Sequence, residues 1–94
     1  MDREMQVLEI LLDSEKQAIS LLQQLLAAGK NEKLFRKLAK TYSIRSGFRV
    51  REGFLGTIRK QDYDPIGKSC MNMAKGDIMG PIKSKDGYSI VMLL

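Results

Sequence analysis

The C-terminal segment, residues 74–94, constrains the fold more than any other stretch of this chain. Pro81 has no backbone N–H to donate, so the short apolar run around it favours an edge strand or a bulge. The pair Asp86–Gly87 is typical of tight hairpin turns, which need positive φ angles. Residues 88–94 are β-rich and nearly all apolar, as in a strand that is covered on both faces. We therefore expect a terminal hairpin whose last strand lies inside a small sheet.

The N-terminal half predicts one strand and two helices. A strand over residues 5–12 precedes a helix that Ser14 caps and Gly29 ends. Asn31 caps the second helix. Helical spacing predicts the buried faces of the two helices, which are Ala18, Leu21, Leu22, Leu25 and Ala28 in the first and Leu34, Phe35, Leu38, Ala39 and Tyr42 in the second.

The middle of the chain predicts a basic loop, a strand and a weak helix. Residues 41–52 show no clear period, and the glycines in the strand over residues 53–58 indicate a bulge or a close backbone approach. Asp64 can cap a short helix with Pro65 at its first position and with Ile66, Cys70 and Met73 on its inner face. The order β-α-α-β-α-β-β predicts a single α+β domain over residues 1–94.

The composition excludes several kinds of chemistry. The chain has no histidine, the commonest general acid/base and metal ligand, and its one cysteine, Cys70, permits neither an internal disulfide nor a cysteine-based zinc site. The net charge is +5, with a local excess over residues 45–60, but no nucleic-acid motif accompanies it and aromatic residues are few. The apolar runs are too short to span a bilayer. We expect no cofactor, no metal, no nucleic-acid partner and no membrane span in this segment.

Four segments together resemble the parvulin family of peptidyl-prolyl isomerases, over nearly the whole chain from Met5 to Leu93. They are FRKLAKTYS at residues 35–43, GFLG at 53–56, KGDIMGPI at 75–82 and GYSIV at 87–91. The resemblance implies a four-stranded antiparallel sheet flanked by helices. It also implies a mechanism without covalent chemistry, in which a pocket that prefers the twisted X–Pro amide lowers a rotation barrier of roughly 20 kcal/mol.

The resemblance also assigns site positions, and most of them carry other residues here. The family's two histidines fall at Glu9 and Ser89, and its cysteine or aspartate falls at Arg45, or at Ser46 if the loop is aligned differently. Its proline-gripping methionine and phenylalanine fall at Asp62 and Ile66, its leucine is retained as Leu55, and a later core phenylalanine is replaced by Met71. The candidate catalytic set is therefore Glu9, Arg45 and Ser89, and the candidate substrate-binding set is Leu55, Asp62, Tyr63, Ile66 and Met71.

Two local questions stay open at the level of sequence. Glu9 either forms an ion pair with Arg45 or is solvated in an open pocket with Arg45 pointing away. Asp62 either places a charge at the mouth of the proline pocket or faces water while Tyr63 fills the gap.

Two functions are consistent with this pattern. The chain is either a weak isomerase that works through pocket shape, with Leu55 and Ile66, or a non-catalytic module that binds proline-containing or unfolded polypeptide or packs against neighbouring domains. The lack of histidine favours the second function. The resemblance further implies client polypeptides as partners, a place for residues 1–94 within a larger folding factor with other domains, and a periplasmic or otherwise extracytoplasmic bacterial location.

Overall fold

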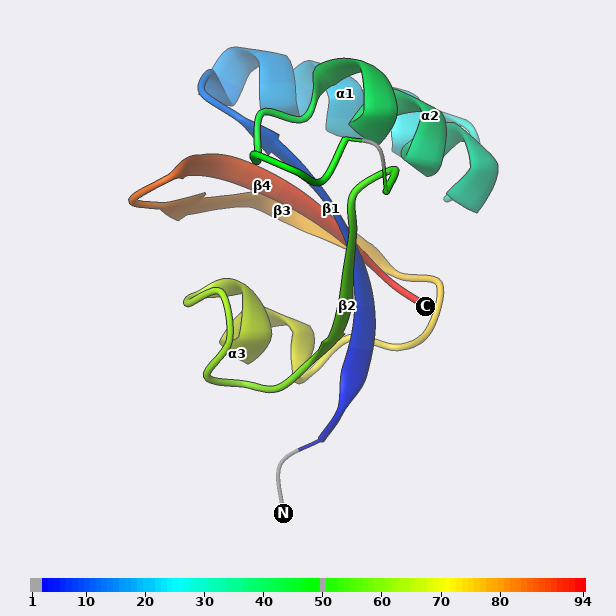
Figure 1. Ribbon diagram of the computed structural model, residues 1–94. Coiled ribbons are helices and arrows are strands. Elements are labelled where there is room, and N and C mark those ends of the chain that lie inside the picture. The colour runs from blue at the N-terminus through cyan, green and yellow to red at the C-terminus, as the bar shows by residue number, and fades with distance from the viewer. Residues whose placement is uncertain (1–2, 50) are drawn as a thin grey trace.

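The computed structural model describes residues 3–49 and 51–94, which form one antiparallel sheet and three helices (Figure 1). The elements in chain order are β1 (Met5–Leu12), α1 (Glu15–Ala27), α2 (Glu32–Tyr42), β2 (Phe54–Ile58), α3 (Ile66–Cys70), β3 (Ile78–Ser84) and β4 (Gly87–Leu93). The four strands lie in the order β2-β1-β4-β3. The predicted α+β architecture and element order are therefore confirmed.

The helices cover opposite faces of the sheet, with α1 and α2 on one side and α3 on the other (Figure 1). Because successive side chains of a strand point to opposite faces, β1 contributes Leu8, Ile10 and Leu12 to the core under α1 and α2, and Met5 and Val7 to the core under α3. Both faces of β4 are buried from Ser89 to Leu93. The last strand thus lies between β1 and β3, inside the sheet, as predicted.

The terminal hairpin combines an edge strand with a bulge. The pairing of β3 with β4 shifts between Met79 and Ile82, where Pro81 cannot donate to the ladder. Ser84 pairs with Gly87 across a turn of two residues, Lys85 and Asp86. Both features predicted for Pro81, an edge position and a bulge, are therefore present.

The predicted caps of the two long helices are confirmed. The Ser14 hydroxyl accepts from the backbone N–H of Gln17 at 3.2 Å, and the Asn31 side chain accepts from the backbone N–H of Leu34 at 3.0 Å. The backbone N–H groups in the first turn of a helix have no intrahelical partner, so each cap satisfies one of them.

Three finer predictions about helix ends are wrong. Ala28 lies beyond the end of α1 and is exposed. Tyr42 is also exposed, because α2 ends there and the next residue, Ser43, turns inward instead. The short helix begins at Ile66 with Pro65 in the cap position, and the Asp64 carboxylate lies 3.6 Å from the Lys68 ammonium group, without capping the helix. No helix among the described residues is long and apolar enough to cross a membrane.

Candidate functional site

Glu9 is a carboxylate buried in the middle of β1, on the face that α3 covers, with an exposed fraction of 1%. Its Oε2 atom accepts from the Ser89 hydroxyl at 2.8 Å and from Nη2 of Arg45 at 2.9 Å, and its Oε1 atom accepts from Nε of Arg45. Ser89 and Glu9 are neighbours because β1 and β4 pair with Leu11 opposite Ser89 and Glu9 opposite Val91. The sequence hypothesis of an ion pair is therefore confirmed, and Glu9 is not solvated.

The backbone after α2 places Arg45 over this carboxylate. The Ser43 hydroxyl accepts from the backbone N–H of Leu11 at 3.0 Å, and the N–H of Ile44 donates to the Leu11 carbonyl at 2.8 Å. The chain therefore runs along the end of β1 before it reaches Arg45. Ser46, the other residue that loop alignment allowed, is exposed and does not contact Glu9.

The contacts of Arg45 fix its charge and its orientation. The hydrogen bond to the Glu9 carboxylate raises the pKa of Arg45 above its ordinary value, so the guanidinium is charged at neutral pH. Two parallel N–H···O bonds to one carboxylate are the strongest geometry available to an arginine. Glu9, Arg45 and Ser89 thus form a hydrogen-bonded network that holds a fixed cation and contains no histidine.

The outer side of Arg45 faces a small aromatic cluster. The centroid of the Tyr63 ring lies 5.1 Å from Cζ of Arg45. Phe48 packs edge to face against Tyr63, with 6.4 Å between the ring centroids. The Asp86 carboxylate in the hairpin turn lies 3.7 Å from Nη1 of Arg45. Phe48 and Asp86 were not in the predicted site. Phe48 is an aromatic residue inside a polar, basic loop, and this is the one feature of the sequence that could have indicated it. Hydrophobic periodicity does not detect such a residue, because a loop has no period.

Leu55 and Ile66, two of the predicted substrate-binding residues, lie inside the protein. Leu55 is 7% exposed and Ile66 is 1% exposed, and both belong to the core under α3 together with Cys70. Met71 is half-buried against the same core. A ligand therefore reaches Leu55 or Ile66 only if α3 moves, and their role in binding stays a prediction.

Asp62 and Tyr63 lie in the turn before α3. The Asp62 carboxylate accepts from the backbone N–H of Arg59 at 2.9 Å, as a residue that shapes its own turn does. Tyr63 is half-buried with a φ of 48°, and its ring covers Arg45. Tyr63 thus forms part of the wall of the candidate site, whereas Asp62 stabilises the turn that carries it.

Three adjoining depressions surround the Arg45–Asp86 pair. One of about 600 Å³ is lined by Tyr63, Asp64, Pro65, Ser84, Lys85 and Asp86. The second, of about 420 Å³, is lined by Leu11, Ile44, Arg45, Ser46, Phe48 and Asp86. The third, of about 390 Å³, lies over residues 42–47 and Arg49. The first and second depressions share Asp86, and the second and third share residues 44–46, so the three adjoin one another. We call the three depressions together the path.

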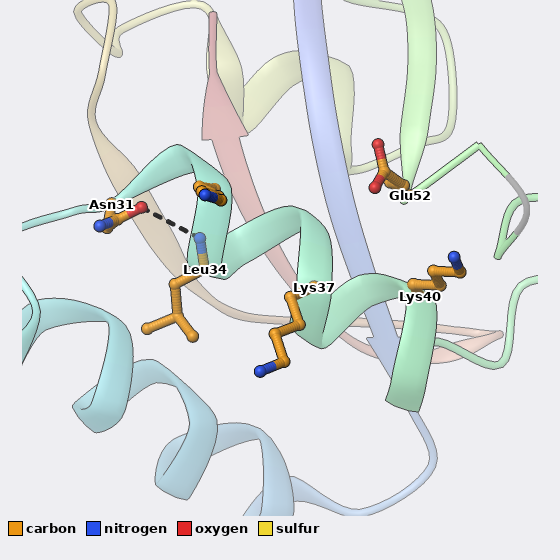
Figure 2. A pocket seen from close by; sticks show the side chains of 6 residues that line it. Asn31, Leu34, Lys37, Lys40 and Glu52 are labelled. Atoms are coloured by element: carbon orange, nitrogen blue, oxygen red, sulfur yellow. Dashed lines mark hydrogen bonds between the residues drawn. The ribbon is translucent and has the colours of Figure 1, made fainter.

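A fourth depression, of about 460 Å³, lies along α2 and is lined by Asn31, Lys33, Leu34, Lys37, Lys40 and Glu52 (Figure 2). Figure 2 shows Leu34 pointing toward α1, whereas the side chains of Lys37 and Lys40 leave α2 in different directions. Because these lysines do not converge on one point, we interpret them as a solvated basic face.

Cys70, the one cysteine of the chain, is buried in the core under α3. Burial raises the pKa of the Cys70 thiol to about 11, so the thiolate that reacts as a nucleophile is scarce at neutral pH. Within residues 3–49 and 51–94, no group of three or more His, Cys, Asp or Glu side chains is arranged to hold a metal ion. What the arrangement offers is a positioned cation, two aromatic rings and neighbouring depressions, which suit binding of a polypeptide backbone.

Residues 6–94 match the family described as rotamase, the PPIC-type PPIase domain. None of the curated proteins matches the chain. Among solved structures, PrsA from Bacillus subtilis is 29% identical with a TM-score of 0.83, over 96% of this chain and 34% of PrsA. The Pin protein of the archaeon Cenarcheaum symbiosum is 33% identical with a TM-score of 0.79, over 100% of this chain and 94% of its own.

Another similar structure is from work on two structurally related SurA-like chaperones of Campylobacter jejuni, the virulence factor PEB4 and the periplasmic protein Cj1289. It is 26% identical to this chain with a TM-score of 0.83, over 96% of this chain and 37% of its own. The chain thus spans about a third of the length of PrsA and of this chaperone, and nearly the whole length of the archaeal protein.

Proposed function

Because the chain belongs to the PPIC-type, or parvulin, family of peptidyl-prolyl isomerases, we propose that it is a polypeptide-binding module in which rotamase activity is weak or lost. The observation that carries the proposal is the closed Glu9–Arg45–Ser89 network. It occupies the positions at which the family resemblance places two histidines and a cysteine or aspartate. The fold is thus retained, while a buried ion pair stands where the family resemblance places the histidines.

The second support is the state of the expected proline pocket. Catalysis of rotation requires a site that binds the twisted amide better than the planar one, in an apolar cleft that excludes water. Leu55 and Ile66, which would grip the proline ring, are covered by the protein itself. Binding of a polypeptide in the depressions around Arg45 needs no such pocket, because most residues of their walls, such as Ile44, Phe48 and Asp86, are exposed or half-buried.

A protease-coupled isomerisation assay on a series of Xaa-Pro peptides tests the proposal. We expect a rate close to the uncatalysed one, and binding of proline-containing peptides in an NMR titration with shifts centred on Arg45, Phe48 and Tyr63. A high isomerisation rate would show that the ion pair replaces the histidines in function. An absence of both activity and binding would leave a module that only packs against neighbouring domains.

We also propose that residues 1–94 are one module of a larger, extracytoplasmic folding factor. The share of PrsA and of the Campylobacter chaperone that this chain spans supports a multidomain parent, and Cj1289 is described as periplasmic. Cell fractionation of the complete protein tests the location, and a parent protein with no further domain would contradict the first part.

A further inference from the structure

We propose that Tyr42 and Ile44 form an apolar subsite, which takes a large apolar side chain of the polypeptide bound over Arg45. The inference rests on the proposed function and adds to it a preference for the bound sequence. The subsite lies in the third of the depressions described above, which adjoins Arg45. Neither Tyr42 nor Ile44 is among the candidate site residues that the family resemblance assigns.

Both side chains are unusually exposed for their size. Tyr42 is 41% exposed and Ile44 is 50% exposed, although the residue between them, Ser43, is buried. Ser43 has an extended conformation, with φ −65° and ψ 133°. Tyr42 and Ile44 nevertheless line the same depression, while the Ser43 side chain between them is buried against β1.

The backbone that carries them is fixed at several points. Ser43 accepts from Leu11 through its hydroxyl, and its N–H donates to the Ala39 carbonyl at 3.0 Å. Arg49 closes the other wall, because Nε and Nη2 donate to the carbonyls of Lys40 and Thr41 at 3.0 and 2.9 Å. The apolar surface is therefore preformed, and a ligand that binds it loses little affinity to the ordering of the protein.

Continuity with the candidate site identifies the occupant. The third depression shares Ile44, Arg45 and Ser46 with the one that holds Phe48 and Asp86. An extended chain that crosses Arg45 therefore reaches Ile44 without leaving the path. Arg49 donates N–H groups to carbonyls at the end of α2, and Arg45 donates to the Glu9 carboxylate. Because these donors are already engaged, the incoming side chain meets mainly apolar contacts at this end of the path.

The experiment uses a set of proline-containing peptides in which a single leucine is moved one position at a time through a serine-rich background. Affinities are measured by NMR titration for the wild type, for Ile44→Ser and for the control Ile19→Ser. Ile19 is 41% exposed on α1 and lines none of the three depressions. The wild type should bind one leucine position about tenfold more tightly than the others, as burial of part of a leucine side chain implies.

The variants separate the subsite from the rest of the site. Ile44→Ser should lose this roughly tenfold preference and still bind every peptide, whereas Ile19→Ser should keep it. Tyr42→Ser should also reduce the leucine preference. Agreement between the two variants would show that the loss does not come from a local structural change in only one of them. If Ile44→Ser and Tyr42→Ser both retain the wild-type preference, or the wild type has none, the subsite is disproved while peptide binding stands. If the wild type binds no peptide, the subsite and the proposed function both fail.

Discussion

Glu9 and Arg45 are buried to different extents, and this difference decides which of the two is harder to replace. The Glu9 side chain is 1% exposed, whereas that of Arg45 is 15% exposed. Arg45→Ala leaves a carboxylate inside the sheet and should cost about 3–5 kcal/mol of the free energy of unfolding. Glu9→Ala leaves a guanidinium that can turn toward water, and should cost less. Urea denaturation of the two single variants and the double variant should give a coupling of about 1–3 kcal/mol.

An exposed ion pair provides the control for this cycle. Asp64 and Lys68 are separated by 3.6 Å, and their side chains are 66% and 70% exposed. Surface pairs of this kind contribute at most about 0.5 kcal/mol, so the same cycle should give almost no coupling there. Equal coupling for both pairs would mean that the Glu9–Arg45 contact has no special role in stability.

The sequence could predict this pair but not its surroundings. An acidic residue in an apolar strand needs a partner, and the family resemblance places Arg45 and Ser89 at the site positions next to Glu9. Phe48 lies at the site because its loop packs against Tyr63, and Asp86 lies there because the hairpin turn approaches Arg45. Loops and turns have no sequence period, so neither residue could be predicted from the pattern. The burial of Leu55 and Ile66 also follows from how α3 packs, which a residue-by-residue comparison cannot give.

At the scale of the elements, the start of β2 is held against β1 by a contact that only glycine permits. Gly53 has a φ of 81°, and a Cβ atom at Gly53 would overlap the Glu9 carbonyl oxygen. The Glu9 N–H in turn donates to the Gly53 carbonyl at 2.9 Å. The prediction that glycines in this strand mark a bulge or a close backbone approach is confirmed, with the close approach at Gly53 and a shift of the β1–β2 pairing between Phe54 and Gly56. The candidate site thus depends on a contact made by the main chain of Glu9 as well as by its side chain.

Gly53→Ala should therefore destabilise the protein much more than Gly29→Ala. Gly29 has a similar φ of 77°, but nothing lies within 4 Å of the position that its Cβ would occupy. Gly29→Ala should cost about 1 kcal/mol from backbone strain alone, and Gly53→Ala about 2–4 kcal/mol because β1 and β2 must also move apart. Thermal or urea unfolding measures both. Equal losses would show that β1 and β2 separate at no cost at this point.

The helix ends show where local sequence reasoning stops. Ser14 and Asn31 cap their helices as predicted, because a cap is decided within one turn. Tyr42 continues the helical stripe in sequence, but it is the last residue of α2, and the chain turns at Ser43, whose side chain is buried instead. The periodic pattern therefore predicted a core residue where the structure has an exposed aromatic residue.

At the scale of the whole molecule, the two faces of the sheet are covered unequally. α1 and α2 span residues 15–27 and 32–42, and each begins with a side-chain cap. α3 has only 5 residues, contains Gly67 and has no side-chain cap. The layer that covers Leu55 and Ile66 is therefore the less stable of the two layers. A proline ring could reach these residues only through the opening of this layer.

Hydrogen exchange should detect that opening. We expect the amides of residues 66–70 to exchange at least about tenfold faster than those of residues 89–93, because β4 lies between two strands and is buried on both faces. NMR-detected exchange on the free protein measures the ratio. If the proline pocket is used, a saturating proline peptide should change exchange in residues 66–70. If binding is confined to the path over Arg45, protection should rise in residues 42–49 and in the turns at residues 63–65 and 84–86, and not in residues 66–70. Equal protection of α3 and β4 in the free protein would mean that the layer opens only when the whole domain unfolds, and Leu55 and Ile66 would then act as core residues alone.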